Sequence, residues 1–268
     1  MKLKIGIGLT VLLVTFIAIC NVNSMDKRTI MENIQEQPYG QLSYDFIQAI
    51  RYDKPTNNII KKLAIVDEDV LAAELHNDNR RKAFWVNVYN GFVILFLKQD
   101  STLYEDRSAF FKKKRITIAG KKLSFDDIEH GIIRRSKIKL SLGFLSKWNV
   151  DDFEKKFRTD EVDYRIHFAL NCGAKSCPAV AAYTADSLDT QFEKSTNLHL
   201  NKTSAFDEED DEVHITSLFS WFRGDFGGKK EVKQILKRHG IVPKNEEDID
   251  IEYNTYDWTL NIDNFVDL

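Results

Sequence analysis

The chain has 268 residues, of which 43% are hydrophobic and 12% aromatic. This composition predicts a folded protein with a substantial buried core and excludes a mainly disordered chain. The formal charge of −3 at pH 7 does not indicate the basic face of a nucleic-acid-binding protein, so no nucleic-acid partner is expected.

The first 24 residues have the pattern of a secretory signal peptide. Lys2 and Lys4 precede sixteen uncharged residues, and small residues stand at 22 and 24, the two positions that a signal peptidase reads. We therefore expect cleavage after Ser24 and a secreted or periplasmic protein. The alternative is an uncleaved membrane anchor, although the apolar run is shorter than the roughly 20 residues of a typical span. Membrane contact is expected only through this segment, if it is retained.

Residues 25–74 are predicted to form a helical lead-in to a single domain at 75–268. Apolar residues recur at helical spacing over residues 41–76, where Pro55 interrupts them. Residues 79–99 are apolar nearly all round, which predicts a central buried helix rather than a surface helix.

A hairpin and a helix are predicted next. Residues 115–125 alternate between apolar and polar on each side of Ala119 and Gly120, which is the pattern of a hairpin. Ser124 and Asp127 resemble a capping box that opens a helix over residues 125–135.

Further elements are expected after this helix. Residues 163–170 look like a strand, Thr184 is expected to cap a helix that runs through residues 191–200, and residues 206–212 form an acidic surface loop. A helix over residues 214–228 and a closing aromatic strand over residues 249–261 complete the chain. Helices and strands mix without a regular βαβ alternation, so the predicted class is α+β with a mixed or antiparallel sheet.

Glu129 and His130 are candidate catalytic residues on the predicted helix. At about 100° per residue, Glu129 falls inside the apolar arc that contains Ile128 and Ile132, and His130 lies just beyond its edge. A buried carboxylate needs a partner, and groups in such surroundings cluster at functional sites. The alternative is a structural ion pair with an arginine such as Arg134.

Asn87 and Asn90 lie on one face of the predicted buried helix, because they are three residues apart. Buried amides require hydrogen-bond partners. The two side chains could orient an imidazole, bind a substrate carbonyl, or tie the helix to a neighbouring loop, and the last is the common role for any one buried amide.

Cys172 and Cys177 are the only cysteines after residue 24. In an oxidising compartment, such a pair is first interpreted as a disulfide, and the four intervening residues allow the turn. A metal site with His167 would lack the close Cys-x2-Cys pair of zinc sites, so we expect no metal or other cofactor. A thiol–disulfide redox role is disfavoured because the pair also lacks Cys-x-x-Cys spacing.

Cys172 could instead be a nucleophile. A chain that leaves a strand through Asn171, Cys172 and Gly173 can expose both the sulfur and backbone N–H groups for an oxyanion. In an extended strand His167 would lie about 16 Å from Cys172 on the opposite face, so His167 is interpreted as a packed strand histidine. His130 is then the candidate base.

Several blocks of the sequence together resemble one family. They are FWVNVYN (84–90), FFKKKRITIAGKKLSFDDIEHGIIR (110–134), RIHFALNCGAKSCPAVAAYT (165–184), LFSWFRGDFG (218–227) and YDWTLN (256–261). In this order they are similar to the domain of unknown function 547 family, over about residues 75–261. The resemblance implies no established reaction, but it marks Trp85, Asn171 and Gly173 as candidate substrate-binding residues. It also implies serine in plant-type relatives at the position of Cys177, so a disulfide would not be the family-wide purpose of Cys172.

Two functions are therefore predicted. One is a cysteine-dependent acyl-transfer hydrolase or transferase, in which Cys172 attacks, His130 is the base, and Glu129, Asn87 or Asn90 orients the imidazole. The other is a non-catalytic binding or interaction module of the cell envelope, with Cys172 and Cys177 joined as a structural disulfide. The sequence specifies no substrate and no partner.

Overall fold

The structure is a computed structural model that describes residues 37–246 and 248–268. The predicted signal peptide and the start of the lead-in lie outside these residues. Tyr39–Leu268 form one compact unit. Within the described ranges, no helix is both long enough and apolar enough to cross a membrane.

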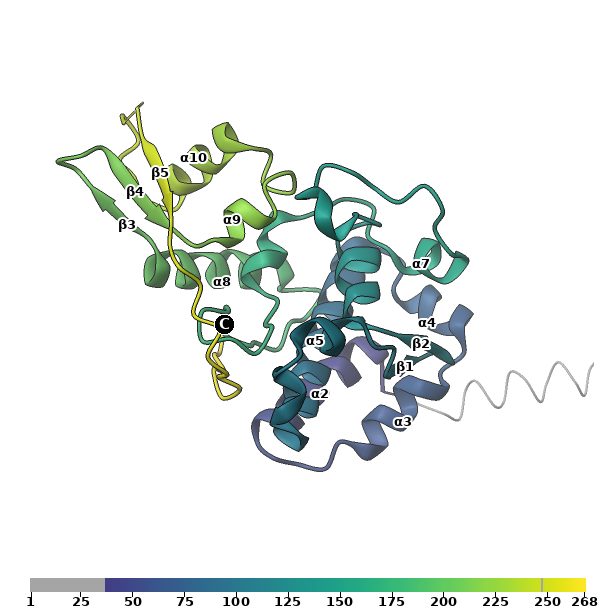
Figure 1. Ribbon diagram of the computed structural model, residues 1–268. Coiled ribbons are helices and arrows are strands. Elements are labelled where there is room, and N and C mark those ends of the chain that lie inside the picture. The colour runs from purple at the N-terminus through teal and green to yellow at the C-terminus, as the bar shows by residue number, and fades with distance from the viewer. Residues whose placement is uncertain (1–36, 247) are drawn as a thin grey trace, which may run out of the picture. The chain divides into compact units, whose positions relative to one another are not determined.

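The N-terminal part of the unit is a group of helices around one long helix (Figure 1). Its members are α2 (Tyr39–Arg51), α3 (Asn57–Ile65), α4 (Glu68–Glu74) and α5 (Asp78–Gln99). Asn77 caps α5 by accepting a hydrogen bond from the backbone N–H of Arg80. Most of the middle of α5 is buried on all sides, which confirms the predicted central helix. Gly91 lets α2 approach α5, since a Cβ there would lie 2.5 Å from the ring of Phe46.

The predicted hairpin is confirmed. Strands β1 (Ile116–Ile118) and β2 (Lys121–Leu123) pair antiparallel across Ala119 and Gly120, which have φ of 47° and 73°. Positive φ at both central residues is the geometry of a tight two-residue turn.

The predicted capping box is also present. Ser124 N–H donates to Asp127 Oδ2 at 2.9 Å, and Asp127 N–H donates to Ser124 Oγ at 3.0 Å. The helix that it opens is η2 (Asp127–Ile133), which is a π-helix rather than the α-helix that a spacing of 100° assumes. Backbone bonds from Arg134 N–H to the carbonyl of Glu129, five residues back, show the wider turn. Such turns often occur at functional sites.

The rest of the unit alternates short helices with a small sheet. The remaining elements are η1 (Ser101–Tyr104), α6 (Arg107–Lys112), η3 (Lys139–Ser141), α7 (Asp152–Phe157), η4 (Tyr164–Phe168), α8 (Leu188–Thr203), β3 (Ala205–Asp207), β4 (Glu212–Ile215), α9 (Leu218–Trp221), α10 (Lys229–Arg238) and β5 (Asp250–Tyr253). Strand β4 pairs antiparallel with β3 and parallel with β5. The mixed sheet, together with the helices, confirms the α+β class.

Several sequence-based assignments were wrong in detail. The helix predicted over residues 214–228 is only α9, because residues 214–215 belong to strand β4, and the acidic loop predicted over 206–212 overlaps strands β3 and β4. Residues 163–170 are not a strand: Asp163 accepts a hydrogen bond from Arg165 N–H and caps the 3₁₀ helix η4. Thr184 does not cap α8, which begins at Leu188. The closing strand is only β5, because the following chain leaves the sheet.

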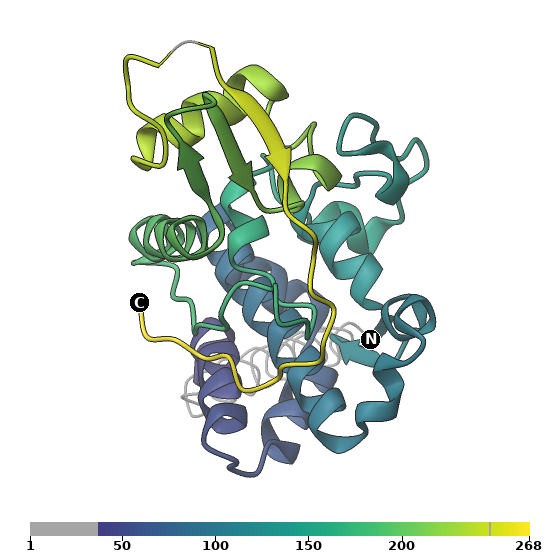
Figure 2. The ribbon, with the colours of Figure 1, turned by 60° about the vertical axis from the view of Figure 1, so that its left-hand side comes forward.

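The C-terminal segment after β5 connects the two ends of the unit. In Figure 2 it runs from the sheet back to the helices, past the loop that carries the cysteines. Isolated bridges pair Leu260 with Ala174 and Phe265 with Val180. Arg51 of α2 forms an ion pair with Asp267.

The described residues have two hydrophobic clusters. The larger surrounds α5 and includes Phe125, whereas the smaller lies between the sheet, α9 and α10 and includes Phe219 and Phe226. A candidate site lies between them.

Candidate functional site

A cavity of about 370 Å³ lies between the two clusters and is mostly apolar. Its walls come from α5, the π-helix, the cysteine loop, α9 and the C-terminal segment. They are lined by Tyr89, Phe111, Asp126, Glu129, His130, Lys139, Leu140, Leu142, His167, Leu170, Cys172, Cys177, Leu218, Trp221, Phe222, Tyr256 and Trp258. An apolar cavity with a few polar groups on its walls has the general character of a ligand site.

Glu129 reaches this cavity from the π-helix. Its carboxylate accepts a hydrogen bond of 3.0 Å from the hydroxyl of Tyr89 on α5. Burial, reinforced by the charge of Glu129, raises the pKa of Tyr89 well above its usual value, so the phenol keeps its proton and remains the donor. Among the described residues, no lysine or arginine forms an ion pair with Glu129.

His130 is buried beside Glu129 and is held by an arginine. Arg134 Nη1 lies 2.8 Å from His130 Nδ1. A guanidinium can only donate, so Nδ1 accepts and the proton of the neutral ring is on Nε2. Nε2 is buried and makes no hydrogen bond in the described structure. Burial first, and then the charge of Arg134, lowers the pKa of His130 to about 3. This neutral ring, with its Nδ1 lone pair occupied, is poorly suited to be a general base.

Arg134 continues a buried polar chain to a second histidine. Its Nε donates to Asp225 Oδ2 at 2.6 Å, and both side chains are fully buried. His167 Nε2 lies 2.9 Å from the same Asp225 oxygen. Burial alone would raise the pKa of Asp225, but the hydrogen bonds from His167 and Arg134 outweigh it and lower the pKa. Desolvation lowers the pKa of His167, and the Asp225 hydrogen bond opposes this only in part.

His167 corrects the geometry assumed for the sequence. Because η4 is helical, His167 is not on a strand that points away from Cys172. Its ring stacks on Phe222 at a centroid distance of 3.9 Å and lines the same cavity as the cysteines. Asp225 holds the ring, as a carboxylate does in many acid–base sites.

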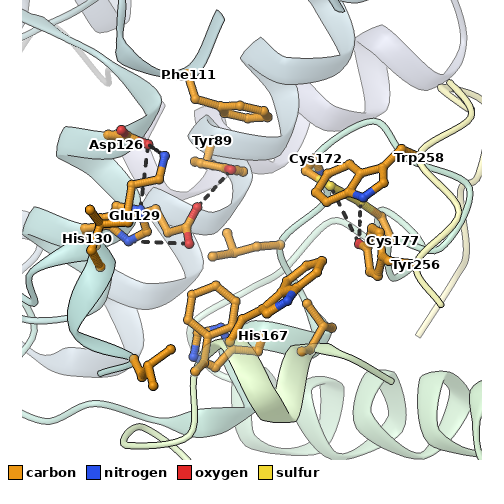
Figure 3. Close-up of a pocket in the computed structure, with 17 residues that line it drawn as sticks. Tyr89, Phe111, Asp126, Glu129, His130, His167, Cys172, Cys177, Tyr256 and Trp258 are labelled. Carbon is orange, nitrogen blue, oxygen red and sulfur yellow. Dashed lines mark hydrogen bonds and ion pairs between the residues drawn. A yellow bond between two sulfur atoms is a disulfide. The ribbon is translucent and has the colours of Figure 1, made fainter. Parts of the chain in front are cut away.

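Cys172 and Cys177 form a disulfide on the opposite side of the cavity from Glu129 and His130 (Figure 3). Tyr256 OH lies 3.2 Å from Cys177 Sγ and 3.7 Å from Cys172 Sγ. The nearby backbone donors are in use. Cys172 N–H donates to Cys177 Sγ at 3.0 Å, and Gly173 N–H donates to Asn171 Oδ1 at 2.7 Å. Neither of these two N–H groups is therefore free to stabilise an oxyanion.

The three candidate asparagines hold the backbone rather than line the cavity. Asn87 bonds to the backbone N–H and C=O of Tyr183. Asn90 accepts from Asn171 N–H and donates to the carbonyl of Ala169, both at 2.8 Å. Asn171 in turn donates to the carbonyl of Pro178. These bonds position the chain that carries the disulfide.

Trp85 and Gly173 also lie outside the cavity lining. Trp85 is fully buried against Phe153 and Phe157. Gly173 has a φ of 86°, and a Cβ there would lie 2.7 Å from Leu97. Both residues contribute to packing in this structure.

The structure thus brings Glu129, His130, Cys172 and Cys177 to one cavity but shows no hydrogen bond between His130 and either cysteine.

The sequence analysis missed Asp225 and placed His167 on a strand away from the cavity. Asp225 could have been found from the sequence, because it stands in the aromatic block 218–227, where an acidic residue among aromatic neighbours suggests a buried carboxylate. Within the described ranges, no group of three or more histidine, cysteine or acidic side chains is placed to hold a metal ion.

The fold and the cavity define an α+β protein with a disulfide-bearing apolar site between two cores. Residues 73–200 match the model of the family described as "Protein of unknown function, DUF547". The match over these residues confirms the predicted resemblance to this family. A search of curated proteins and a search of solved structures each found no match. The matched range contains the π-helix and the disulfide, and it ends before Asp225 and the aromatic wall.

Proposed function

We propose that the cavity binds a small amphiphilic molecule with an apolar body and a cationic head. The proposal depends on one observation above all: the carboxylate of Glu129 faces a largely apolar cavity without an ion-pair partner from lysine or arginine among the described residues. A cation that entered the cavity would provide the missing charge, at a place where low polarity strengthens the attraction.

The opposite wall suits the same ligand. Trp221 and Trp258 stack at a centroid distance of 5.6 Å and an interplanar angle of 18°, and Tyr256 contacts both rings. Faces of aromatic rings attract organic cations, with contributions of roughly 0.5 to 2 kcal/mol per contact. Leu140, Leu142 and other aliphatic side chains provide a surface for an alkyl chain.

Binding can be measured by the change in tryptophan fluorescence on titration with dodecyltrimethylammonium below its micelle concentration. Replacing Glu129 by Gln is expected to weaken binding by about tenfold or more, because an interaction with a charged group contributes roughly 1.5 to 3 kcal/mol. The amide can still accept from Tyr89, so the fold is preserved. Dodecanol is expected to bind E129Q and the parent about equally.

The matched control is Glu208→Gln, on the exposed turn between β3 and β4, which should leave both affinities unchanged. Dodecanoate is expected to bind more weakly than the ammonium compound. Equal binding of the ammonium compound to the parent and E129Q would contradict the role of the carboxylate.

The disulfide favours this binding function over acyl transfer, because a sulfur in a disulfide is not a nucleophile. The cysteine-dependent hydrolase or transferase stays a prediction that requires the reduced protein. A variant with Cys172→Ala and Cys177→Ala distinguishes the two. The binding proposal expects ammonium affinity to persist, with a loss of about 2 kcal/mol in the free energy of unfolding from opening a short loop. Acyl transfer would instead show as covalent labelling of Cys172 by an activated ester after reduction, faster than labelling of free cysteine.

We also propose that the protein acts outside the cytoplasm, as the sequence of residues 1–24 predicts. A disulfide between Cys172 and Cys177 is compatible with an oxidising compartment. Mass spectrometry of exported protein, with alkylation before reduction, tests both points. It should find Met25 at the N-terminus and no alkyl group on either cysteine.

A further inference from the structure

The loop of residues 137–148, between the π-helix and α7, exposes an unusual number of large apolar side chains. We call it the 137–148 loop. Its exposed apolar residues are Ile138, Leu140, Leu142, Phe144, Leu145 and Trp148. Leu140 is 91% exposed and Trp148 is 100% exposed. An apolar surface of this kind marks an interaction site on a protein that otherwise buries such residues.

The loop backbone is ordered by its own hydrogen bonds, so this exposure belongs to a defined structure. Ser141 Oγ donates to the carbonyl of Ile138 at 2.8 Å and accepts from Leu145 N–H at 3.1 Å. Ile138 N–H donates to the carbonyl of Leu145 at 2.9 Å. The backbone itself thus holds the apolar side chains outward.

The base of the loop is fixed to the polar chain of the site. Gly224 N–H donates to the carbonyl of Leu142 at 2.7 Å. Gly143 has a φ of 90°, and a Cβ there would lie 2.3 Å from Asp225 Oδ1. Only glycine allows this close approach, which ties the loop to the buried Asp225.

The loop is also basic, although the whole chain has a formal charge of −3. The 137–148 loop contains three lysines and no acidic residue, and Arg135 lies two residues before it. Lys139 pairs with Asp126 and Lys147 with Glu154. Lys137 in the loop and Arg135 just before it form no ion pair with the described part of the chain, so this region keeps a net positive charge.

We propose that the 137–148 loop docks the protein onto the surface of an anionic lipid bilayer. Exposed Trp, Phe and Leu beside Lys and Arg match the two attractions of such a surface. The apolar side chains enter the boundary between headgroups and acyl chains, and the basic groups contact anionic headgroups. The long lysine side chains can keep their charge at headgroup level while their methylene groups cover apolar surface.

The charge pattern favours a bilayer over an apolar protein partner. A protein interface core is depleted in lysine, whereas here lysines alternate with the apolar residues along the chain. The loop also borders the cavity, which Leu140 and Leu142 line. An amphiphile in the bilayer would therefore enter the cavity from the side that faces the membrane. This consequence rests on the proposed function, whereas docking of the loop does not depend on it.

Quenching by brominated phosphatidylglycerol vesicles tests docking on the full chain. The N-terminal segment contributes no tryptophan signal, because the four tryptophans of the chain are Trp85, Trp148, Trp221 and Trp258. The difference in fluorescence between the parent and Trp148→Phe gives the contribution of Trp148. This contribution is expected to be strongly quenched on the vesicles. A variant with Leu140→Ser and Phe144→Ser should shift the lipid concentration for half quenching upward by about tenfold or more.

The matched control is Ile65→Ser on α3, which removes another exposed apolar side chain, 71% exposed, and should not shift the curve. All substituted residues are exposed, and circular dichroism checks that each variant folds. Vesicle-bound protein with unquenched Trp148, or no binding, would overturn the proposal. Equal quenching by phosphatidylcholine vesicles would overturn the preference for anionic lipid. A dimer in which Trp148 stays unquenched would instead show that the loop binds a second copy of the protein. Because the readout is at the loop, failure here leaves the ammonium titration of the cavity unaffected.

Discussion

Replacing Asp225 by Asn is expected to lower the free energy of unfolding by about 3 to 5 kcal/mol, because it leaves a buried charge without its partner. Asp225 accepts from both Arg134 and His167, and the Arg134 and Asp225 side chains are fully buried. An amide can replace the hydrogen-bonding atoms in part but not the negative charge. Urea unfolding followed by circular dichroism measures the change.

The control for this substitution is Asp210→Asn in the exposed turn after β3, which is expected to change stability by less than about 0.5 kcal/mol. A second variant separates charge from packing. Combining Asp225→Asn with Arg134→Met removes both charges, so it should be more stable than D225N alone. If the double variant is the less stable of the two, the uncompensated guanidinium is not the cause of the loss.

The second large effect is a pH dependence that originates at His130. Its pKa is about 3 in the folded protein and close to 6.5 in the unfolded chain. Between these values the unfolded state binds the proton, so the stabilisation is fully present above about pH 6.5 and is lost as the pH falls toward 3. The free energy of unfolding should therefore fall by about 3 kcal/mol between pH 7 and pH 4 from this group alone.

The variant His130→Gln isolates this contribution, since its amide oxygen can accept from Arg134 and does not titrate. Unfolding is measured for both proteins at several pH values, and the difference between the two curves is the quantity of interest. Burial lowers the pKa of His199 to about 4. His199 is the same in both proteins, so its contribution cancels in the difference between their curves. A difference between parent and H130Q that does not change with pH would contradict the buried neutral imidazole.

Local sequence patterns predicted the elements whose stability is local. The all-round apolar run predicted α5, the alternation around Ala119 and Gly120 predicted the hairpin, and Ser124 with Asp127 predicted the cap of the π-helix. Each of these depends on residues close in the sequence. The same local rules failed for residues 163–170, where apolar spacing fits a strand but the Asp163 cap and the packing of His167 on Phe222 select a 3₁₀ helix.

The candidate site shows the same division. The sequence alone identified the inward Glu129, the cysteine pair and the resemblance to the family whose model matches residues 73–200. That Asn87 and Asn90 bind backbone, and that Glu129 meets Tyr89, follows from contacts between elements about 40 to 96 residues apart.

What the sequence by itself determined is the α+β class, the central helix, the hairpin and the residues on one wall of the cavity. Only the tertiary structure decided that Arg134, Asp225 and His167 form one buried chain, and that the C-terminal segment closes the opposite wall. The physical reason is that hydrophobic periodicity encodes which face of an element is buried, whereas the partner of a buried charge is set by how distant elements pack.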